Sequence, residues 1–420
     1  MRHALLIATT TGYQIRSFGE AAEALGVRLR LASDRCQHLD DPWRDGAIAV
    51  RFHEPRASAG EVAAAFGGSR PAGVLAVGDR PAVLAAHVAD VLGLRGNPPA
   101  AAEASRNKLA SRRALARAGL PVPAFATVPL AAAATALPEV AYPVVLKPLA
   151  LSGSRGVMRA DSRPALVAAL RRLRALLETP EVASERDPLH GDALIESFVP
   201  GREYAVEGVL TAGRFRAFAL FDKPDPLDGP FFEESIYVTP SRATPGVQAA
   251  IVSHVESAVR AIGLVHGPVH AECRVNEEGV FVLEVAARPI GGLCARAVRF
   301  VAPEGTPATL ETVLLRHAVG GDIDGYRLAS DASGVMMIPI PRRGRYRGVS
   351  GVSAAAAVPG VEGVQVTAKP DTLLVPMPEG RSYLGFIFAR ASTAEEAEQA
   401  LRVAHGRLQF RIDREVTLAG

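Results

Sequence analysis

Lysines are scarce in this sequence, and their positions are the first pointer to chemistry. The 420 residues include 47 basic ones, yet only four of them are lysines, Lys108, Lys147, Lys223 and Lys369, because arginine fills almost every other basic position. Lysine presents a compact ammonium, whereas arginine presents a broad planar guanidinium. Each lysine is therefore a candidate for a place that needs a compact charge, such as contact with a phosphate, although any single one could be left by chance.

Two of these lysines stand in segments that suit an anion. Lys108 closes the segment Ser105–Lys108, and Lys147 ends a short apolar strand expected over Tyr142–Pro148. A glycine-rich loop follows that strand and reads Ser152, Gly153, Ser154, Arg155 and Gly156. Glycines let a backbone come close to an anion, and serine hydroxyls and peptide N–H groups donate to phosphate oxygens. Surface turns also read Ser-Gly-Ser, so the loop indicates a phosphate site chiefly because it follows a strand-end lysine.

A pair of glutamates farther along the chain suggests a metal ion. Glu272 lies in a strand expected at 271–275, and Glu284 lies in a strand expected at 280–285, with a tight turn between them. Neighbouring carboxylates, here close to Arg288, are costly to hold unless a cation lies between them. Such oxygen ligands suit a Mg²⁺ ion that bridges nucleotide phosphates. Taken alone, the pair is explained more simply as two solvent-exposed strand glutamates.

The hydrophobic patterns predict the elements that would position these residues. Apolar runs alternate with helical stretches in the first hundred residues, which indicates a parallel α/β layer. Its expected strands are 4–8, 27–31 and 73–77, and its expected helices are 14–25 and 81–92. From residue 124 to about residue 328, short strands mixed with helices favour an α+β arrangement, and the same mixture resumes from residue 334 to residue 412. The helices expected after residue 100 are 101–118, 163–177, 247–262 and 393–405.

Composition excludes several classes of protein. The net charge is only +3 and the basic residues are scattered, unlike the clustered basic surface of a nucleic-acid-binding protein. No apolar run is long enough to cross a membrane, and the apolar start is better explained by a first strand than by a signal peptide. The cysteines Cys36, Cys273 and Cys294 lie far apart and form no metal-binding pattern. We therefore expect a cytoplasmic protein that binds neither nucleic acid nor membrane.

Five segments in this order resemble the ATP-grasp superfamily, over about residues 1–330. They are Ser105–Lys108, Tyr142–Pro148, Leu151–Val157, Leu194–Tyr204 and the paired strands Val269–Glu272 and Val282–Gly292. The resemblance implies the ATP-grasp fold, a combination of α/β and α+β parts. We predict an N-terminal α/β domain at 1–100, an ATP-grasp nucleotide-binding domain at 101–330 and a C-terminal α+β lobe at 331–420.

The same resemblance implies a set of ATP-binding residues. Lys108 and Lys147 would contact the phosphates, and the glycine-rich loop would form a mobile lid over the triphosphate. The residues implied at the base and sugar are Glu196 with the backbones of Phe198 and Val199 at the adenine, and Glu203 at the ribose hydroxyls.

Metal binding and catalysis are also implied by the resemblance. Glu272 and Glu284 would bind Mg²⁺, or Mn²⁺ in its place, and Arg288 would lie next to the transferred phosphoryl group. Lys223 would be a further phosphate-contacting lysine, although spacing varies there. One departure concerns the metal: many members have Glu-x-Asn-x-Arg, and here Ala286 replaces the asparagine and cannot be a ligand. The number of metal ions is therefore open.

The implied reaction is ligation of a small-molecule carboxylate to an amine through an acyl phosphate, with release of ADP and phosphate. The segment Glu284 to Gly292 and the long C-terminal lobe are most similar to bacilysin-type L-amino acid ligases and carnosine-synthase-like enzymes. Candidate substrate-facing residues are Glu233 or Glu234, for an α-ammonium group, with His270, Gly291 and Gly292. Solvent exposure explains the two glutamates equally well. The resemblance also suggests a homodimer.

Four alternatives remain at this point. Two are members of the same superfamily, a biotin-carboxylase-like enzyme and a purine-biosynthetic ligase. A third is a binding module that holds ATP without turnover. An NAD-dependent dehydrogenase is disfavoured, because no G-x-G-x-x-G motif follows the first strand and the lysines would have no explanation.

Overall fold

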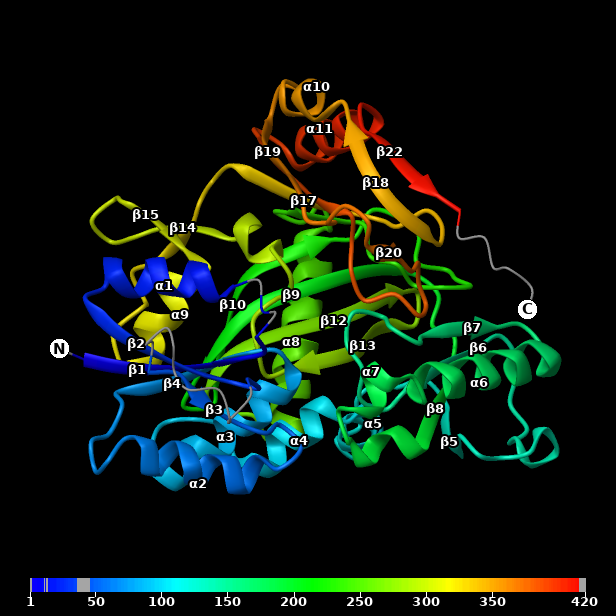
Figure 1. The fold of residues 1–420 in the computed structure, drawn as a ribbon, viewed down its shortest axis with the longest axis horizontal. Helices are drawn as coiled ribbons and strands as arrows, with labels where there is room; N and C mark the ends of the chain where they lie inside the picture. Colours follow the sequence, from blue (N-terminus) through cyan, green and yellow to red (C-terminus); the bar gives the residue numbers. More distant parts are fainter. Residues whose placement is uncertain (1, 11, 13, 36–45, 415–420) are drawn as a thin grey trace.

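A parallel sheet forms the N-terminal part of the computed structural model, which describes residues 2–10, 12, 14–35 and 46–414 (Figure 1). Its strand order is β3-β2-β1-β4. The strands are β1 (Arg2–Ala8), β2 (Val27–Ser33), β3 (Ile48–Ala49) and β4 (Gly73–Val77). Helices α1 (Ile15–Ala24), α2 (Pro55–Ala65), α3 (Asp79–Leu92) and α4 (Pro99–Arg106) accompany them. The predicted parallel α/β layer is confirmed, and the apolar start of the chain is a strand.

Strand β1 shows why this layer is buried on both faces. Leu6 packs in one apolar cluster with Phe18 of α1, and Leu5 and Ile7 pack in another with Val62 of α2. Successive side chains of a strand point to opposite faces, so an uninterrupted apolar run requires cover on both sides. The helices on the two faces of the sheet provide that cover (Figure 1).

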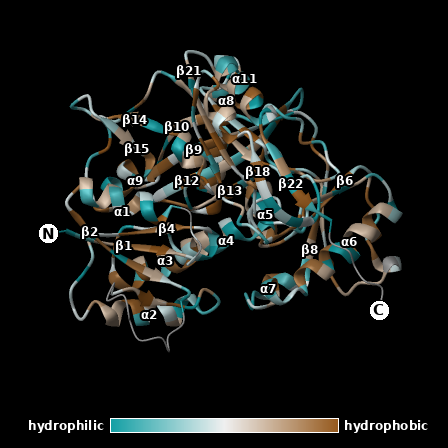
Figure 2. Cartoon of the chain, turned by 45° about the horizontal axis from the view of Figure 1, so that its top comes forward, coloured by the Kyte–Doolittle hydropathy of each residue, from teal (hydrophilic) through white to brown (hydrophobic). Residues whose placement is uncertain are grey.

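An eight-stranded antiparallel sheet forms the centre of the molecule. Its order is β13-β12-β9-β10-β11-β17-β21-β19. The strands are β9 (Arg202–Thr211), β10 (Arg214–Asp222), β11 (Ile236–Thr239), β12 (Gly267–Asn276), β13 (Gly279–Ala286), β17 (Ala332–Ile338), β19 (Val361–Val366) and β21 (Gly385–Ala391). Hydrophobic segments occur along these strands and along the strands of the N-terminal sheet (Figure 2). The sheet contains strands from both sides of residue 331, so the predicted division between the second and third domains remains a proposal.

Helices cover this central sheet. Helix α8 (Pro245–Ile262) packs with α5 (Lys108–Arg117) against β9, β12 and β13, and α11 (Ala394–Gly406) packs against β11, β17 and β21. Helix α11 begins with a capping box between Thr393 and Glu396. Smaller elements complete this part: β14 (Arg299–Val301), β15 (Pro307–Thr309), β16 (Arg327–Leu328), β18 (Gly344–Ser350), β20 (Leu373–Leu374), β22 (Gln409–Asp413), α9 (Leu310–Ala318), α10 (Val352–Ala356) and η3 (Cys294–Ala297).

A small lobe stands beside the central sheet and carries the glycine-rich loop. Its strands, in the order β5-β8-β6-β7, are β5 (Phe125–Pro129), β6 (Val144–Pro148), β7 (Met158–Ala160) and β8 (Asp192–Ser197). Its helices are η1 (Ala134–Ala136), α6 (Arg163–Leu177), α7 (Pro180–Ala183) and η2 (Pro188–Gly191). Helix α6 buries a row of leucines against the sheet, among them Leu166, Leu170 and Leu173. In the described part of the chain, no helix is long and apolar enough to span a membrane.

The helix predicted over 101–118 is wrong as a single element. The structure has two helices, α4 and α5, that meet at Asn107. The Asn107 side chain accepts hydrogen bonds from the backbone N–H groups of Leu109 and Ala110, at 3.1 and 3.2 Å, and so starts a new helix. The break places Lys108 in the first turn of α5.

The glycine-rich loop is packed more tightly than its sequence suggests. Gly156 has φ +75°, and a Cβ added there would lie 2.9 Å from Leu173 and 3.2 Å from Leu176 of α6. Its peptide N–H donates to the Pro378 carbonyl at 2.8 Å. Gly153 also has a positive φ, of +62°, yet an added Cβ would meet nothing within 4 Å. A side chain at Gly153 would therefore meet backbone strain alone, whereas a side chain at Gly156 would also overpack against α6.

We expect Gly156→Val to destabilise the small lobe. Overpacking against α6 and a left-handed backbone together cost about 2–4 kcal/mol, which lowers the apparent Tm by several degrees. Gly153→Ala is the matched control and has only the backbone cost, about 1 kcal/mol. Differential scanning fluorimetry without nucleotide measures both variants, and equal melting of the two would contradict this packing of Gly156.

Candidate active site

One large cavity, of about 1000 Å³, collects most of the residues that the sequence singles out. The N-terminal sheet, the small lobe, the central sheet and the segment 372–383 all contribute to its walls. The predicted residues that line it are Lys108, Lys147, Ser152, Gly153, Ser154, Arg155, Glu196, Phe198, Val199, Glu203, Glu234, His270, Glu272, Glu284, Arg288, Gly291 and Gly292. Three others, Gly156, Lys223 and Glu233, do not line it.

Lys147 is held by a buried ion-pair network. Its Nζ lies 2.6 Å from Glu196 Oε2, and Arg112 Nε donates to Glu196 Oε1 at 2.5 Å. Strands β6 and β8 are neighbours in the sheet, which brings Lys147 and Glu196 together. Burial would raise the pKa of Glu196, but the charges of Arg112 and Lys147 prevail and lower it to about 2. The Glu196 side chain therefore orients Lys147 in this structure.

Lys108 connects the glycine-rich loop to the central sheet. Its Nζ donates to the Leu151 carbonyl at 2.7 Å and lies 3.3 Å from Glu284 Oε2. Arg112 of the same helix donates to the carbonyls of Val282 and Leu283 on β13. Helix α5 therefore carries Lys108 itself. It also sets the position of Lys147, because Arg112 of this helix holds Glu196 and Glu196 holds Lys147.

Glu272 and Glu284 are directly opposite each other on β12 and β13, as the sequence predicts. Both line the cavity, and both lie near an ammonium group: Glu272 is 3.2 Å from Lys223 and Glu284 is 3.3 Å from Lys108. Paired carboxylates of this kind fit a hard cation such as Mg²⁺. Ala286, on the same strand as Glu284, is buried and has no donor atom to add.

Lys223 lies beneath the cavity, among three carboxylates. Its Nζ lies 2.8 Å from Glu203, 2.7 Å from Glu234 and 3.2 Å from Glu272. Burial would lower the pKa of Lys223, but the three carboxylates raise it well above its usual value. Burial together with Glu272 raises the pKa of Glu234 to about 7. The ammonium of Lys223 thus offsets part of the negative charge on the floor of the cavity.

The residues predicted at the base and sugar also have protein partners. Glu203 accepts from Lys223 and, at 2.9 Å, from Arg274 Nε. Arg274 donates as well to the Val199 carbonyl at 2.8 Å and stacks on the Phe198 ring, with its Cζ 5.1 Å from the ring centroid. Arg274 therefore organises the whole segment at this end of the cavity.

Arg288 is fixed by a residue that the sequence reasoning missed. Asp79, in the first turn of α3, lies with Oδ1 2.7 Å from Arg288 Nε. Asp79 follows β4 directly, at the carboxyl end of a parallel strand, which is where ligand sites form in α/β sheets. That position is the signal that could have identified it. Gln14, Arg112 and Glu207 were missed as well.

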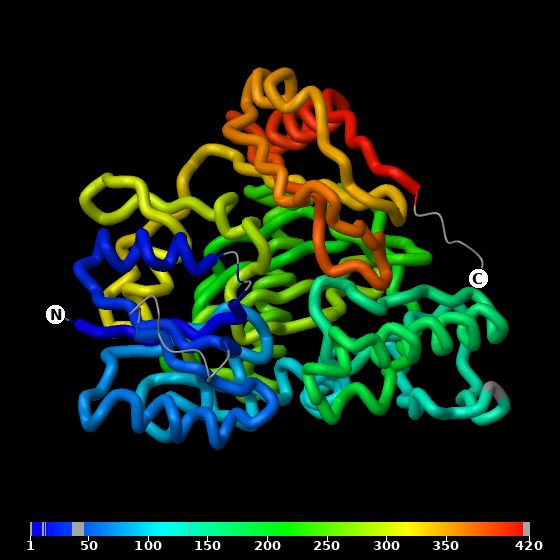
Figure 3. Tube along the Cα trace, in the orientation of Figure 1, coloured from blue at the N-terminus to red at the C-terminus, as the bar shows by residue number. Residues whose placement is uncertain are grey.

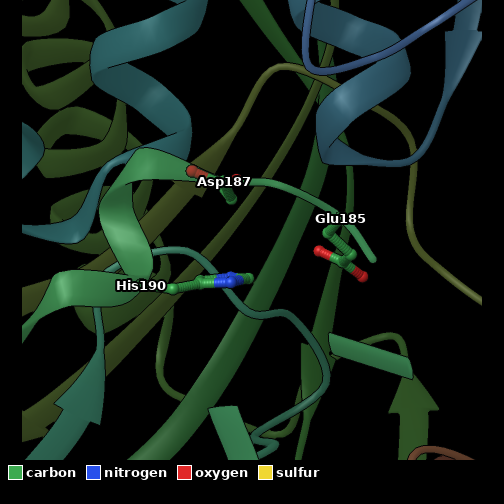
Figure 4. A group of neighbouring side chains, drawn as sticks. All are labelled: Glu185, Asp187 and His190. Atoms are coloured by element: carbon green, nitrogen blue, oxygen red, sulfur yellow. The ribbon is translucent and has the colours of Figure 1, made fainter. Parts of the chain in front are cut away.

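A second group of metal-type side chains lies between the small lobe and the N-terminal part. Glu185, Asp187 and His190 lie close together around the segment that joins α7 to η2 (Figure 4). Arg106 forms an ion pair with Asp187, and Arg80 lies 3.5 Å from Glu185. Since arginines already neutralise the two carboxylates, we interpret the group as a contact between the lobes.

Contacts on the other side join the small lobe to the C-terminal segment (Figure 3). Arg155 Nε donates to the Glu379 carbonyl at 2.9 Å, and its Nη1 lies 2.9 Å from Glu181 Oε1. Arg172 pairs with the Glu379 carboxylate through two nitrogens. The glycine-rich loop is thus docked against segment 376–381 in this conformation.

Two family models match the chain. Residues 140–297 match the ATP-grasp domain, and residues 336–413 match the L-amino acid ligase C-terminal domain 2. The chain therefore carries an ATP-grasp domain followed by an L-amino acid ligase C-terminal domain. Both matches point to similarity with the ATP-grasp L-amino acid ligases, which are ADP-forming ligases that make C–N bonds.

Individual relatives agree with these matches. The crystal structure of L-amino acid ligase from Bacillus licheniformis aligns with a TM-score of 0.78 at 24% identity, over 99% of this chain and 100% of that chain. The uncharacterized protein y4rH of Sinorhizobium fredii is 26% identical over 96% of this chain and 82% of its own length. Alanine–anticapsin ligase of Bacillus subtilis is 28% identical over 48% of this chain, and the match spans only 44% of that enzyme.

The Glu196 network predicts how stability depends on pH. A carboxylate whose pKa falls from 4.5 to about 2 on folding stabilises the native state above pH 4.5, and this contribution is lost as the pH falls toward 2. We expect Glu196→Gln to lower the free energy of unfolding by about 3 kcal/mol at pH 7 and by much less at pH 3.

Urea unfolding at the two pH values measures this difference. The exposed Glu139→Gln is the control and should unfold like the wild type at both. A loss of equal size at pH 7 and pH 3 would contradict an ionised, paired Glu196.

Proposed function

We propose that this protein joins the carboxylate of an amino acid to the amine of a second molecule, at the expense of ATP. In this reaction the carboxylate attacks the terminal phosphorus, ADP leaves and an acyl phosphate forms. The amine then attacks the acyl carbon, and phosphate leaves as the amine loses its proton. The products are ADP, phosphate and an amide.

One observation carries this proposal. Segments of the matched L-amino acid ligase domain, including Met337, Tyr383 and Phe386, line the same cavity as Lys147 and the Glu272–Glu284 pair. The cavity therefore combines a nucleotide end with an end made by a domain characteristic of amino acid ligases. This supports amino acid ligation over the biotin-carboxylase-like and purine-biosynthetic alternatives.

Each group in the cavity has a task that suits its chemistry. Lys108 and Lys147 bind the ATP phosphates, and Mg²⁺, or Mn²⁺, at Glu272 and Glu284 would neutralise phosphate charge. Arg288, oriented by Asp79, steadies the charge on the transferred phosphoryl group. The docked glycine-rich loop excludes water from the acyl phosphate.

At the nucleotide end, several predicted roles remain proposals. The backbones of Phe198 and Val199 hold the adenine, while the Glu196 side chain orients Lys147. Glu203 faces the ribose, and its pairing with Lys223 and Arg274 fixes its direction. Lys223 acts on the charge of the carboxylates, since it does not line the cavity.

Glu234 is the better candidate for an α-ammonium group of the substrate. It lines the cavity, whereas Glu233 does not. His270 and the turn Gly291–Gly292 line the cavity beyond Arg288 and complete the substrate end. The cytoplasmic location and the homodimer remain predictions.

The first prediction for this function concerns Lys147. Lys147→Ala should lower ATP turnover by roughly 100-fold or more, because one charge-assisted contact to the transferring phosphate is lost. Lys147→Arg should not restore it, since a broad guanidinium replaces a compact ammonium. Phosphate release across a panel of amino acid pairs is the measurement. Exposed Lys369→Ala is the matched control and should behave as the wild type. Wild-type turnover in Lys147→Ala would refute this assignment.

The second prediction for this function concerns which bond of ATP breaks and how strongly the reaction depends on Mg²⁺. The nucleotide product should be ADP, and Glu284→Gln should raise the Mg²⁺ concentration required for half-maximal rate. Chromatography of the nucleotides and a Mg²⁺ titration test both points, with the exposed turn variant Glu278→Gln as control. AMP as product would exclude an acyl phosphate, and ATP binding without any turnover would favour a binding module.

A further inference from the structure

Glu207 is a completely buried glutamate in the middle of strand β9. Its residue surface is 0% exposed, and its strand neighbours on the same face, Ala205 and Val209, belong to an apolar cluster. Burying a carboxylate is costly unless it is paired and hydrogen-bonded. A side chain of this kind in such surroundings requires an explanation other than packing.

The Glu207 carboxylate holds two separate elements through one oxygen. Oε2 accepts from the peptide N–H of Ile290 at 3.1 Å and lies 3.2 Å from His270 Nδ1. Oε1 has no partner within the described residues. His270 is directly opposite Glu207 in the sheet, and its Nε2 lies 3.6 Å from Glu272 Oε1. Glu207 thus links the metal-ligand strand β12 to the segment that follows β13.

That segment, 288–292, is anchored from a second direction by the N-terminal part. Gln14 Nε2 donates to the Ile290 carbonyl at 2.9 Å, and Gln14 is itself only 2% exposed. Arg288 pairs with Asp79. Both backbone polar groups of Ile290, its N–H and its carbonyl, are therefore held by buried side chains, one residue before the Gly291–Gly292 turn.

We propose that Glu207 is a positioning residue for the ligation reaction: it holds His270 beside Glu272 and holds the 288–292 segment in register. Glu207 does not line the cavity, so it acts through these two elements and does not touch the substrates. The proposal rests on the proposed function for its kinetic consequence. Its structural consequence, the ordering of segment 288–292, is independent of that function.

The expected kinetic consequence of losing Glu207 is a lower kcat and a weaker coupling of ATP hydrolysis to amide formation. Small displacements of catalytic groups cost up to roughly 100-fold in rate. A loosened turn beside the acyl phosphate should also let water compete with the amine, so more ADP forms per amide. The two lysines proposed to bind ATP lie on α5 and β6, outside this segment, so KM for ATP should stay within about twofold of the wild type.

Two variants of Glu207 separate the hydrogen bonds from the charge. Glu207→Gln keeps one acceptor oxygen that both donors can reach, and we expect kcat within about threefold of the wild type. Glu207→Leu has a similar size but no acceptor, so we expect kcat to fall about 10- to 100-fold and the ratio of ADP to amide to rise. Glu311→Leu is the matched control, since Glu311 is 4% exposed on α9 and its hydrogen-bonding neighbours lie at the start of that helix.

Hydrogen exchange of the full-length protein gives a readout that needs no activity. The peptide covering 288–294 should exchange faster in Glu207→Leu than in the wild type, Glu207→Gln or Glu311→Leu. If Glu207→Leu does not fold, Gln14→Met tests the same segment from its other anchor and should give the same faster exchange and lower kcat.

Three results would overturn the proposal. One is unchanged exchange of 288–294 in Glu207→Leu and in Gln14→Met. Another is a Glu207→Gln variant as impaired as Glu207→Leu, which would assign the effect to charge. The last is a Glu207→Leu variant whose Tm and kcat fall by the same amounts as in Glu311→Leu, while its ratio of ADP to amide stays at the wild-type value. If instead the wild type forms no amide with any substrate pair while the exchange results hold, the proposed function fails and the positioning of segment 288–292 stands.

Discussion

Negative charge crowds the floor of the cavity, and the buried ammonium of Lys223 is the interaction on which the rest of the site depends. Glu203, Glu234 and Glu272 all lie within 3.2 Å of its Nζ. Without a cation, carboxylates this close repel one another strongly and at least one of them must take up a proton. Burial and the neighbouring Glu272 raise the pKa of Glu234 even beside Lys223, so the single ammonium balances only part of the negative charge. The remaining demand for positive charge suits a site that receives a metal ion and an ammonium group.

Cationic groups around this floor come from separate parts of the chain, and each is held in place by a carboxylate of its own. Glu196 holds Lys147, Asp79 holds Arg288, and Glu203 holds Arg274. A side chain locked in this way loses little freedom when substrate binds, so its contacts are available to the transition state. The docking of the glycine-rich loop on segment 376–381 brings the C-terminal segment to the wall of the same cavity.

Much of this arrangement could be predicted from residue types along the chain. The parallel N-terminal layer follows from uninterrupted apolar strands, and the Glu272–Glu284 pair follows from two strands joined by a tight turn. The lysines were informative because arginine fills nearly every other basic position. The single helix over 101–118 was wrong, because a local cap at Asn107 outweighed a continuous helical pattern. Gly156 was expected to face phosphate, and its packing against α6 could not be read from a Ser-Gly-Ser loop.

The sequence by itself determined the class of fold, and it predicted candidate nucleotide-binding residues and a reaction through its resemblance to a family. Those features depend on local periodicity and on short segments, which a linear chain displays directly. Only the tertiary structure decided that Asp79 and Gln14, from the first hundred residues, hold Arg288 and Ile290 near residue 290. It also decided that Glu207 lies behind His270 and that Lys223 lies beneath the cavity. These pairings join residues far apart in sequence, and their energy comes from electrostatic attraction and hydrogen bonding in a buried setting, which no local pattern records.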